Sequence, residues 1–312
     1  MALCLVTGGA GFIGSHLVDA LLERGHRVRV LDDFSTGSPA NLVMVRDRIE
    51  LIEGDLTNLE TVREAVQGVE AVYHQGALPS VPRSVADPWA THQVCATGTL
   101  NVLLAARDAK VRRVVYAASS SAYGNSERLP KRETDPVNPL SPYAVAKLTG
   151  EHYCAAFSKV YGLETVRLRY FNVFGPRQSP NSPYAAVIPR FMEAMMTGRP
   201  PRIHGDGLQS RDFTYVDNVV DANLRAVEAP NVSGQVYNIA CGERITLLAL
   251  VTKINALLGT RIDPLHEPMR PGDVRHSLAD ISRAQSDLGY RPRVNLDAGL
   301  GRCFESMLAK AA

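Results

Sequence analysis

Apolar positions in the first half of the chain follow two alternating patterns. Short apolar runs predict strands at Leu3–Thr7, Arg27–Leu31, Ile49–Ile52, Ala71–His74, Val114–Ala118 and Thr165–Tyr170. Between them, apolar residues at intervals of three and four predict helices at Ile13–Arg24, Asn58–Gln67, Pro88–Ala109 and Pro142–Tyr161. This alternation predicts an α/β fold in which helices cover both faces of a doubly wound parallel sheet.

The pattern changes after Asn172, where prolines cluster and loops become frequent. We expect residues 1–175 to form the main domain, with segments near 213–242 returning to it. In particular, the chain should re-enter the sheet near Phe213–Val216 and Val236–Ala240. Residues 176–212 and 243–312 are expected to form a smaller C-terminal α/β region that binds the substrate.

Composition excludes several classes of protein. The 312 residues are 45% hydrophobic and 21% charged, with a formal net charge of +2, so nothing indicates disorder or a nucleic-acid partner. No apolar run approaches the roughly 18 residues of a membrane span, and the N-terminus reads as a first strand, not as a signal peptide. The five cysteines form no Cys-x-x-Cys pair, which predicts a cytoplasmic protein without a metal site.

A glycine-rich loop connects the first strand to the first helix. Gly8, Gly11 and Gly14 allow a tight turn, close approach of the backbone to a pyrophosphate, and close packing of the helix on the strand. Asp32 follows the second strand, where a carboxylate binds the ribose hydroxyls of a dinucleotide. The carboxylate would repel a 2′-phosphate, so the sequence predicts a Rossmann-type domain that binds NAD and not NADP.

A second acidic residue, Asp55, follows the third predicted strand. Its carboxylate could accept a hydrogen bond from the amino group of adenine. The alternative is that Asp55 is exposed and caps the next helix.

A tyrosine and a lysine provide the candidate chemistry. Tyr143 and Lys147 are four residues apart at the start of a predicted helix and therefore share a face. We expect the ammonium of Lys147 and a positively charged nicotinamide to lower the pKa of the Tyr143 phenol, so that it can act as a base. Three serines, Ser119–Ser121, end the preceding strand, and one of them could hydrogen-bond the reacting hydroxyl.

Together these features resemble the extended short-chain dehydrogenase/reductase family, most closely its nucleotide-sugar 4-epimerases. The resemblance extends over essentially the whole chain. It is carried by the Gly8–Gly14 loop, His74-Gln75-Gly76-Ala77, Ser80-Val81-Pro82-Arg83-Ser84, Ser119–Gly124, Tyr143–Lys147, Arg169–Pro176, Ser210-Arg211-Asp212-Phe213 and Arg270-Pro271-Gly272-Asp273.

The resemblance implies a role for each matching residue. Tyr143 would be the catalytic base, Ser119 its hydroxyl partner, and Lys147 the ribose anchor. NAD would be bound by Gly8, Gly11, Phe12, Ile13, Gly14, Asp32, Asp33, Ser35, Gly37, Asp55, Leu56, Gln75, Ala77, Cys95, Ser119, Tyr143, Lys147, Tyr170 and Val173. The UDP-sugar would be bound by Ser80, Arg83, Ser119, Ser120, Ser121, Tyr143, Asn172, Ala186, Val187, Arg202, Ile203, His204, Arg211, Arg270, Asp273 and Ser277.

The implied activity is 4-epimerisation of UDP-glucose and UDP-galactose by transient oxidation at C4′. One alternative is another nucleotide-sugar reductase of the family, such as a dehydratase or a decarboxylase. Similar dehydratases carry acidic residues where this chain has Ser120 and Ser121, which favours epimerisation. A second alternative is a catalytically silent NAD-binding regulator, but such a protein would not need Ser119, Tyr143 and Lys147 together.

Three further expectations follow from the resemblance. A bulky residue restricts the sugar pocket of similar enzymes where this chain has Ser277, so the pocket could also admit 2-N-acetyl sugars. Cys95 stands where the family usually has asparagine, and a thiol is the weaker hydrogen-bonding group. The helices at Pro88–Ala109 and Pro142–Tyr161 would pair across a two-fold axis in a homodimer.

Overall fold

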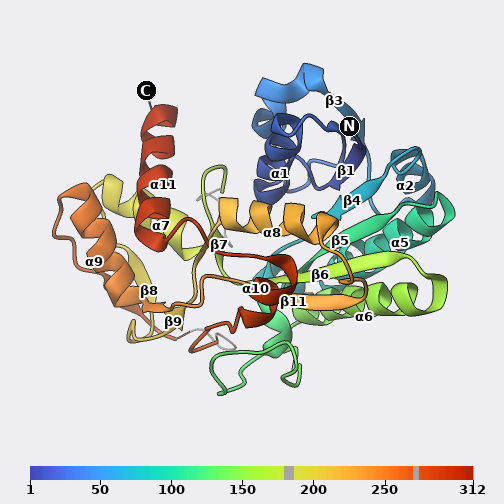
Figure 1. The fold of residues 1–312 in the computed structure, drawn as a ribbon. Helices are drawn as coiled ribbons and strands as arrows, with labels where there is room; N and C mark the ends of the chain where they lie inside the picture. Colours follow the sequence, from blue (N-terminus) through green and yellow to red (C-terminus); the bar gives the residue numbers. More distant parts are fainter. Residues whose placement is uncertain (179–185, 270–273, 312) are drawn as a thin grey trace.

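The computed structural model describes residues 1–178, 186–269 and 274–311. A seven-stranded parallel sheet forms its centre, with the strand order β11-β6-β5-β4-β1-β2-β3 (Figure 1). The strands are β1 (Leu3–Thr7), β2 (Arg27–Asp32), β3 (Ile49–Glu53), β4 (Ala71–His74), β5 (Arg113–Ser119), β6 (Glu164–Tyr170) and β11 (Gln235–Ile239). The predicted doubly wound α/β fold is therefore confirmed.

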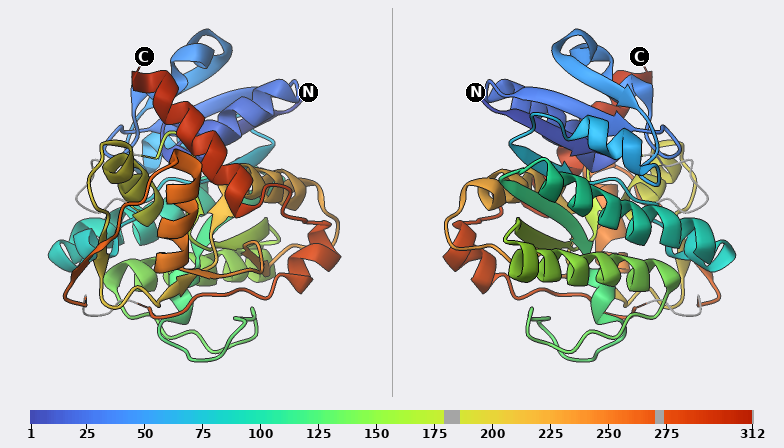
Figure 2. Two further views of the ribbon diagram at one scale, coloured as in Figure 1. Left: turned by 90° about the vertical axis from the view of Figure 1, so that its left-hand side faces the viewer. Right: turned by 90° about the vertical axis from the view of Figure 1, so that its right-hand side faces the viewer.

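Helices cover both faces of this sheet because its central strands are buried on both sides. One apolar cluster joins the sheet to α1 (Phe12–Glu23), α8 (Val216–Glu228) and α10 (Ser282–Leu288). The other joins it to α2 (Leu59–Ala65), α5 (Gly98–Asp108) and α6 (Pro142–Tyr161), which lie together on the opposite face (Figure 2). The 3-10 segments η1 (Pro39–Arg48) and η3 (Ser120–Tyr123) follow β2 and β5.

The helix expected over Pro88–Ala109 is interrupted. It consists of α4 (Pro88–His92), a π-helical turn η2 (Gln93–Thr97) and α5, and it follows the short helix α3 (Val81–Ala86). The Thr99 hydroxyl donates a 2.7 Å hydrogen bond to the Cys95 carbonyl inside this π-turn. The apolar period alone could not predict the turn, because it depends on which partner satisfies each carbonyl.

Within the described residues, the smaller region contains three helices and three pairs of short strands. The helices are α7 (Val187–Met196), α9 (Leu247–Leu258) and α11 (Leu296–Ala311). The strand pairs are β7 (Val173–Phe174) with β10 (Thr214–Tyr215), β9 (Ser210–Arg211) with β12 (Ile245–Thr246), and β8 (Arg202–His204) with β13 (Leu265–Glu267).

The two expected returns to the main sheet have different outcomes. Val236–Ala240 does return, since β11 pairs in parallel with β6. Phe213–Val216 does not, because β10 pairs with β7 in a separate two-stranded sheet. A two-residue strand carries too little pattern to identify its partner, so only the folded chain decides this pairing.

The last third of the chain contributes to both parts of the molecule. Ile281, Ala284 and Leu288, in and around α10, pack in the same apolar cluster as α1 and α8. By contrast, α7, α9 and α11 share a separate apolar core. No helix within the described ranges is long and apolar enough to cross a membrane.

Candidate active site

The glycine loop forms a backbone cradle between β1 and α1. A Cβ on Gly14 would lie 2.1 Å from the Gly8 carbonyl oxygen, and one on Gly8 would lie 2.7 Å from Gly76 Cα, so larger residues would break the loop. Gly11 is the N-cap of α1, and no side chain caps this helix end. The first N–H groups of α1 thus remain free for an anion, which fits the pyrophosphate of a dinucleotide.

Asp32 ends β2 beside this cradle. Its two carboxylate oxygens accept 2.8 Å hydrogen bonds from the backbone N–H groups of Ala10 and Phe34. Burial raises the pKa of this carboxyl, and the two hydrogen bonds oppose that shift. The remaining lone pairs can accept hydrogen bonds from ribose hydroxyls.

Asp55 does not cap the helix that follows it. Its carboxylate accepts a 2.8 Å hydrogen bond from the Thr57 N–H, whereas Asn58 caps α2 through the N–H groups of Glu60 and Thr61. Asp55 also lines the cavity that contains the glycine loop. The helix-cap alternative is therefore removed, and the adenine contact stays a prediction.

Tyr143 lies in the first turn of α6, and its phenol hydrogen-bonds to Ser119 at the end of β5. The Ser119 hydroxyl also accepts a 2.9 Å hydrogen bond from Ser121, which fixes its position. One turn along the helix, Lys147 is buried, with Nζ 4.5 Å from the ring centre of Tyr116. These residues place a phenol, a hydroxyl and an ammonium at one edge of the sheet.

Two contacts hold α6 against the sheet. A Cβ on Gly150 would lie 2.3 Å from the Tyr116 hydroxyl oxygen, so only glycine lets α6 approach β5 this closely. Glu151 accepts hydrogen bonds of 2.8 and 2.9 Å from the guanidinium of Arg169 on β6, and both side chains are buried. Since Lys147 is four residues before Glu151, the same contacts set its position.

The expected lowering of the Tyr143 pKa is not supplied by the protein's own groups. Burial raises the pKa of the phenol above its usual value, and the Ser119 hydrogen bond only partly opposes this. Burial likewise lowers the pKa of the Lys147 ammonium. Desolvation disfavours both charged forms, so a charge that binds in the cavity is needed to favour the phenolate.

A hydrogen-bonded relay of side chains lies beneath the site. His74 shares a 2.7 Å hydrogen bond with the Thr7 hydroxyl and a 3.0 Å hydrogen bond with the Thr99 hydroxyl. Because Thr99 donates to the Cys95 carbonyl, its oxygen accepts from His74 Nε2–H, and in the neutral ring Nδ1 then accepts from the Thr7 hydroxyl. This is the neutral imidazole, and burial lowers the His74 pKa to about 3.

Two residues predicted to contact NAD do not line the cavity. Cys95 is buried in the π-turn, where its sulfur accepts a 3.4 Å hydrogen bond from the Leu78 N–H. Its thiol therefore holds the chain after β4, a role the sequence did not predict. A Cβ on Gly37 would lie 2.9 Å from Asp32 Oδ1, so this glycine permits close packing behind the acidic residue.

The other predicted NAD-binding residues come together as expected from their positions at strand ends. The cavity of about 650 Å³ is lined by Gly8, Gly11, Phe12, Ile13, Gly14, Asp32, Asp33, Ser35, Asp55, Leu56, Gln75, Ala77, Ser119, Tyr143, Lys147, Tyr170 and Val173. It is also lined by ten of the predicted sugar-binding residues, namely Ser80, Arg83, Ser119, Ser120, Ser121, Tyr143, Asn172, Ala186, Arg211 and Ser277.

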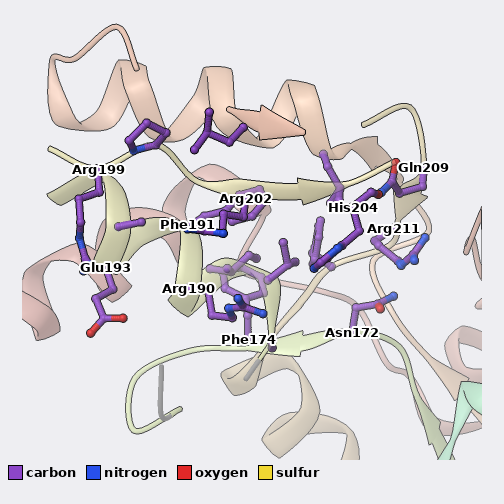
Figure 3. Close-up of a pocket in the computed structure, with 18 of the residues that line it drawn as sticks. Asn172, Phe174, Arg190, Phe191, Glu193, Arg199, Arg202, His204, Gln209 and Arg211 are labelled. Atoms are coloured by element: carbon purple, nitrogen blue, oxygen red, sulfur yellow. The ribbon is translucent and has the colours of Figure 1, made fainter. Parts of the chain in front are cut away.

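A second cavity of about 580 Å³ continues from the first into the smaller region. Asn172 and Arg211 line both cavities and lie close together at one end of the second (Figure 3). Val187, Arg202 and His204, which are predicted to bind the UDP-sugar, line the second cavity, and their contact with the substrate stays a prediction. The two cavities thus adjoin each other at shared lining residues, an arrangement that suits a dinucleotide in one and part of a nucleotide sugar in the other.

One predicted substrate residue does not line either cavity, and two others fall outside the described residues. Ile203 is fully buried in the core of the smaller region, because alternate residues of β8 face opposite sides. Arg270 and Asp273 lie outside the described residues.

Other lining residues escaped the sequence analysis. Lys131 and His276 join the first cavity, and Arg190 joins the second. Lys131 lies in a loop without periodicity, and its surroundings come from distant parts of the chain. For His276, the only sequence signal was its position three residues after the Arg270–Asp273 motif, which could have suggested a place in the site.

Comparison with known proteins agrees with this geometry. A family model described as "NAD dependent epimerase/dehydratase family" matches residues 4–240. A UDP-glucose 4-epimerase of Mycolicibacterium smegmatis is 41% identical over 305 residues, which cover 96% of this chain and 97% of that protein.

Solved structures of nucleotide-sugar 4-epimerases are also similar to this chain. A UDP-N-acetylglucosamine 4-epimerase of Methanobrevibacter ruminantium M1, in complex with UDP-N-acetylmuramic acid, has a TM-score of 0.95 and 38% identity, covering 99% of both chains. A mutant UDP-glucuronic acid 4-epimerase of Bacillus cereus, in complex with a fluorinated UDP-glucuronic acid and NAD, has a TM-score of 0.91 and 32% identity, covering 99% of both chains.

Proposed function

Because this chain belongs to the NAD dependent epimerase/dehydratase family, we propose that it interconverts UDP-glucose and UDP-galactose by inverting C4′ of the sugar. The family resemblance found in the sequence is confirmed, and NAD is the cofactor. The observation that carries the proposal is the placement of Tyr143, Ser119 and Lys147 in one cavity with the glycine loop.

The chain's own residues prepare one proton transfer. Bound NAD supplies the reversible oxidation of C4′ and a positive charge near the phenol. Ser119 orients the 4′-hydroxyl toward Tyr143, which removes the hydroxyl proton and later returns it to the same oxygen. Lys147, one helical turn from Tyr143, would hydrogen-bond the nicotinamide ribose, and its ammonium adds positive charge to the cavity.

Inversion requires that the sugar turn between loss and return of hydrogen at C4′. Arg211 and Asn172, where the two cavities meet, would hold the nucleotide and diphosphate during this turn. Serine hydroxyls bind the sugar with weak, exchangeable hydrogen bonds, so the hexose can present either face. Binding energy should therefore come mainly from the nucleotide.

The acidic residues of the site argue against elimination reactions. Among the described residues, the first cavity contains carboxylates only at Asp32, Asp33 and Asp55, on the cofactor side. A dehydratase needs a carboxyl group near the sugar to remove the 6-hydroxyl, and here Ser120 and Ser121 occupy the strand end. Epimerisation needs only the phenol and the cofactor.

The decisive experiment incubates the purified protein with UDP-galactose without added cofactor and follows the products by NMR. We expect an equilibrium mixture with UDP-glucose, sustained by NAD that copurifies with the protein. Bound NAD without interconversion of any UDP-sugar would instead support a catalytically silent regulator. Loss of water or CO₂ would support one of the sister reactions.

Ser277 supports a wider sugar range. It lies at the sugar-binding cavity, where its hydroxyl accepts a 3.4 Å hydrogen bond from Asn172. A small side chain there leaves space for a 2-N-acetyl group, so UDP-N-acetylglucosamine and UDP-N-acetylgalactosamine should also be interconverted. In Ser277→Tyr the N-acetyl rate should fall much more than the glucose rate, with Ser277→Ala as the control. An unchanged N-acetyl rate in the tyrosine variant would refute this range.

The same proposal includes a homodimer. Helices α3 and α4 pack against α6, and this surface exposes the apolar side chains of Val85, Trp89, Val145 and Tyr153. Such a patch is typical of an interface between subunits. Light scattering should show a dimer for the wild type and a monomer for Trp89→Glu, whereas a monomeric wild type would contradict the proposal.

A further inference from the structure

Acidic and basic side chains line different ends of the first cavity, and the two ends lie at different strands of the sheet. Its acidic residues, Asp32, Asp33 and Asp55, lie at the ends of β2 and β3. Basic residues line it beyond β4, β5 and β6 and on α6, at Arg83, Lys131, Lys147 and Arg211. Among the described lining residues, no carboxylate offsets this positive charge on the sugar side. A pocket lined by one sign of charge favours a substrate of the opposite sign.

Three of the four cations already have a task. The Lys131 ammonium donates to the carbonyl of Ser126. Lys147 lies over a tyrosine ring beneath the reacting phenol, and Arg211 stands where the two cavities meet and is assigned to the diphosphate. The cation that remains on the sugar side is Arg83.

Arg83 lines the same cavity as the reacting group. It lies in the first turn of α3, where its N–H donates a 3.1 Å hydrogen bond to the N-cap hydroxyl of Ser80. This helix packs against α6, which carries Tyr143. Arg83 is half-buried and lines the cavity, yet no carboxylate of the described chain forms an ion pair with it. Its guanidinium is therefore available to a ligand.

Building on the proposed epimerase function, we propose that Arg83 is a specificity-determining residue that binds a carboxylate on the hexose of a UDP-sugar. A guanidinium and a carboxylate pair through two parallel N–H···O bonds, a geometry that a neutral hydroxymethyl group cannot match. C6 is joined through C5 to the carbon that reacts at Tyr143, and Arg83 and Tyr143 line the same cavity, so the C6 carboxylate and Arg83 would share that cavity. The UDP-uronates are thus added to the proposed substrates, so that the enzyme also interconverts UDP-glucuronate and UDP-galacturonate.

The reaction remains an isomerisation. The same two-electron oxidation and return at C4′ applies, and the C6 carboxylate is kept, so no oxidant or other co-reactant is added. The only other hexose carboxylate of the same chemistry is one carried on a substituent, such as the lactyl group at C3 of UDP-N-acetylmuramate. The C6 carboxylate of a uronate and the lactyl carboxylate at C3 differ in position on the sugar, so the affinities of the two UDP-sugars distinguish them.

Binding is measured by calorimetry in the Tyr143→Phe background, so that turnover does not alter the ligand. The ligands are UDP-glucose, UDP-glucuronate, UDP-N-acetylglucosamine and UDP-N-acetylmuramate, each tested on the NAD-bound protein with Arg83, Arg83→Gln or Arg83→Lys. We expect Arg83→Gln to reduce the ratio of UDP-glucuronate to UDP-glucose affinity about ten- to hundredfold, the range of one charged hydrogen-bonding pair. Arg83→Lys should recover part of that ratio.

The matched control is Arg63→Gln on α2, an exposed arginine paired with Glu60, which should leave the ratio unchanged. An Arg83-dependent ratio for UDP-N-acetylmuramate but not for UDP-glucuronate would overturn the uronate and keep a carboxylate-binding Arg83. Equal ratios in all Arg83 variants would overturn the role of this residue altogether. If wild-type protein epimerises no UDP-sugar, the proposed function fails, whereas epimerisation of UDP-glucose with no conversion of UDP-glucuronate defeats this inference alone.

Discussion

The two halves of the site are built in different ways. On the cofactor side, backbone groups form most of the binding surface. The cavity there is made by the glycine loop, the uncapped N-terminus of α1 and the ends of parallel strands. On the substrate side, side chains from two- and three-residue strands and from loops form the lining. A backbone cradle is specified by a few glycines, whereas a side-chain pocket depends on residues that the whole fold must bring together.

Removal of the Tyr143 hydroxyl should have the largest effect, because it lies at the junction of the two halves. In Tyr143→Phe, turnover should fall about 10²- to 10⁴-fold, as expected for loss of a general acid–base group. NAD content after purification and affinity for UDP should change little, since neither the glycine loop nor Arg211 is altered. Turnover within tenfold of the wild type would show that another group moves the proton.

A methyl group in the glycine loop tests the backbone half. In Gly14→Ala the new Cβ would lie 2.1 Å from the Gly8 carbonyl oxygen, so the loop must move. We expect the free energy of unfolding in urea to fall by about 1–3 kcal/mol and copurifying NAD to be largely lost. Gly301→Ala is the control, because nothing lies within 4 Å of that Cβ in α11, and it should be neutral or stabilising.

Loss of a charge tests the side-chain half. Arg211→Gln should raise KM for UDP-sugars about ten- to hundredfold, because a guanidinium at the meeting point of the cavities would no longer pair with the diphosphate. Copurifying NAD should be unaffected, in contrast to Gly14→Ala. If Arg211→Gln also releases NAD, the two halves are not independent.

The effect that is smallest near neutral pH concerns the hydrogen bonds of His74 with Thr7 and Thr99. Burial lowers the pKa of His74 from 6.5 to about 3, so between these values the unfolded chain binds a proton that the folded chain does not. The free energy of unfolding should therefore fall as pH drops below 6.5, by at most about 1.4 kcal/mol per pH unit from this group, and be unaffected by it above 6.5. In His74→Gln the pH dependence should be shallower, whereas the exposed His92→Gln should keep the wild-type slope.

Much of the cofactor half could be predicted from local pattern. The strands at Leu3–Thr7 and Ala71–His74 have the predicted bounds, and the loop between β1 and α1 has the expected geometry. Tyr143 and Lys147 share a face because four residues make about one helical turn. Each of these predictions depends only on residues near one another in the chain.

The substrate half was predicted less completely for a physical reason. The strand β10 pairs with β7 and not with the main sheet. No local sequence pattern indicated that Lys131, Arg190 and His276 would line the cavities. Even Arg83, which a motif did mark, shows its significance only once the charges around the cavity are known. These features arise from contacts between elements far apart in the sequence.

Residue pattern along the chain was enough to predict most strands of the main sheet, the helices between them, the glycine cradle and the tyrosine–lysine pair, because covalent spacing sets helical and strand periods. Three other features depend on tertiary packing: the π-turn at Cys95, the neutral state of His74 and the raised pKa of Tyr143. Burial and hydrogen-bond partners control protonation and irregular turns, and both come from packing of segments that the chain order keeps apart.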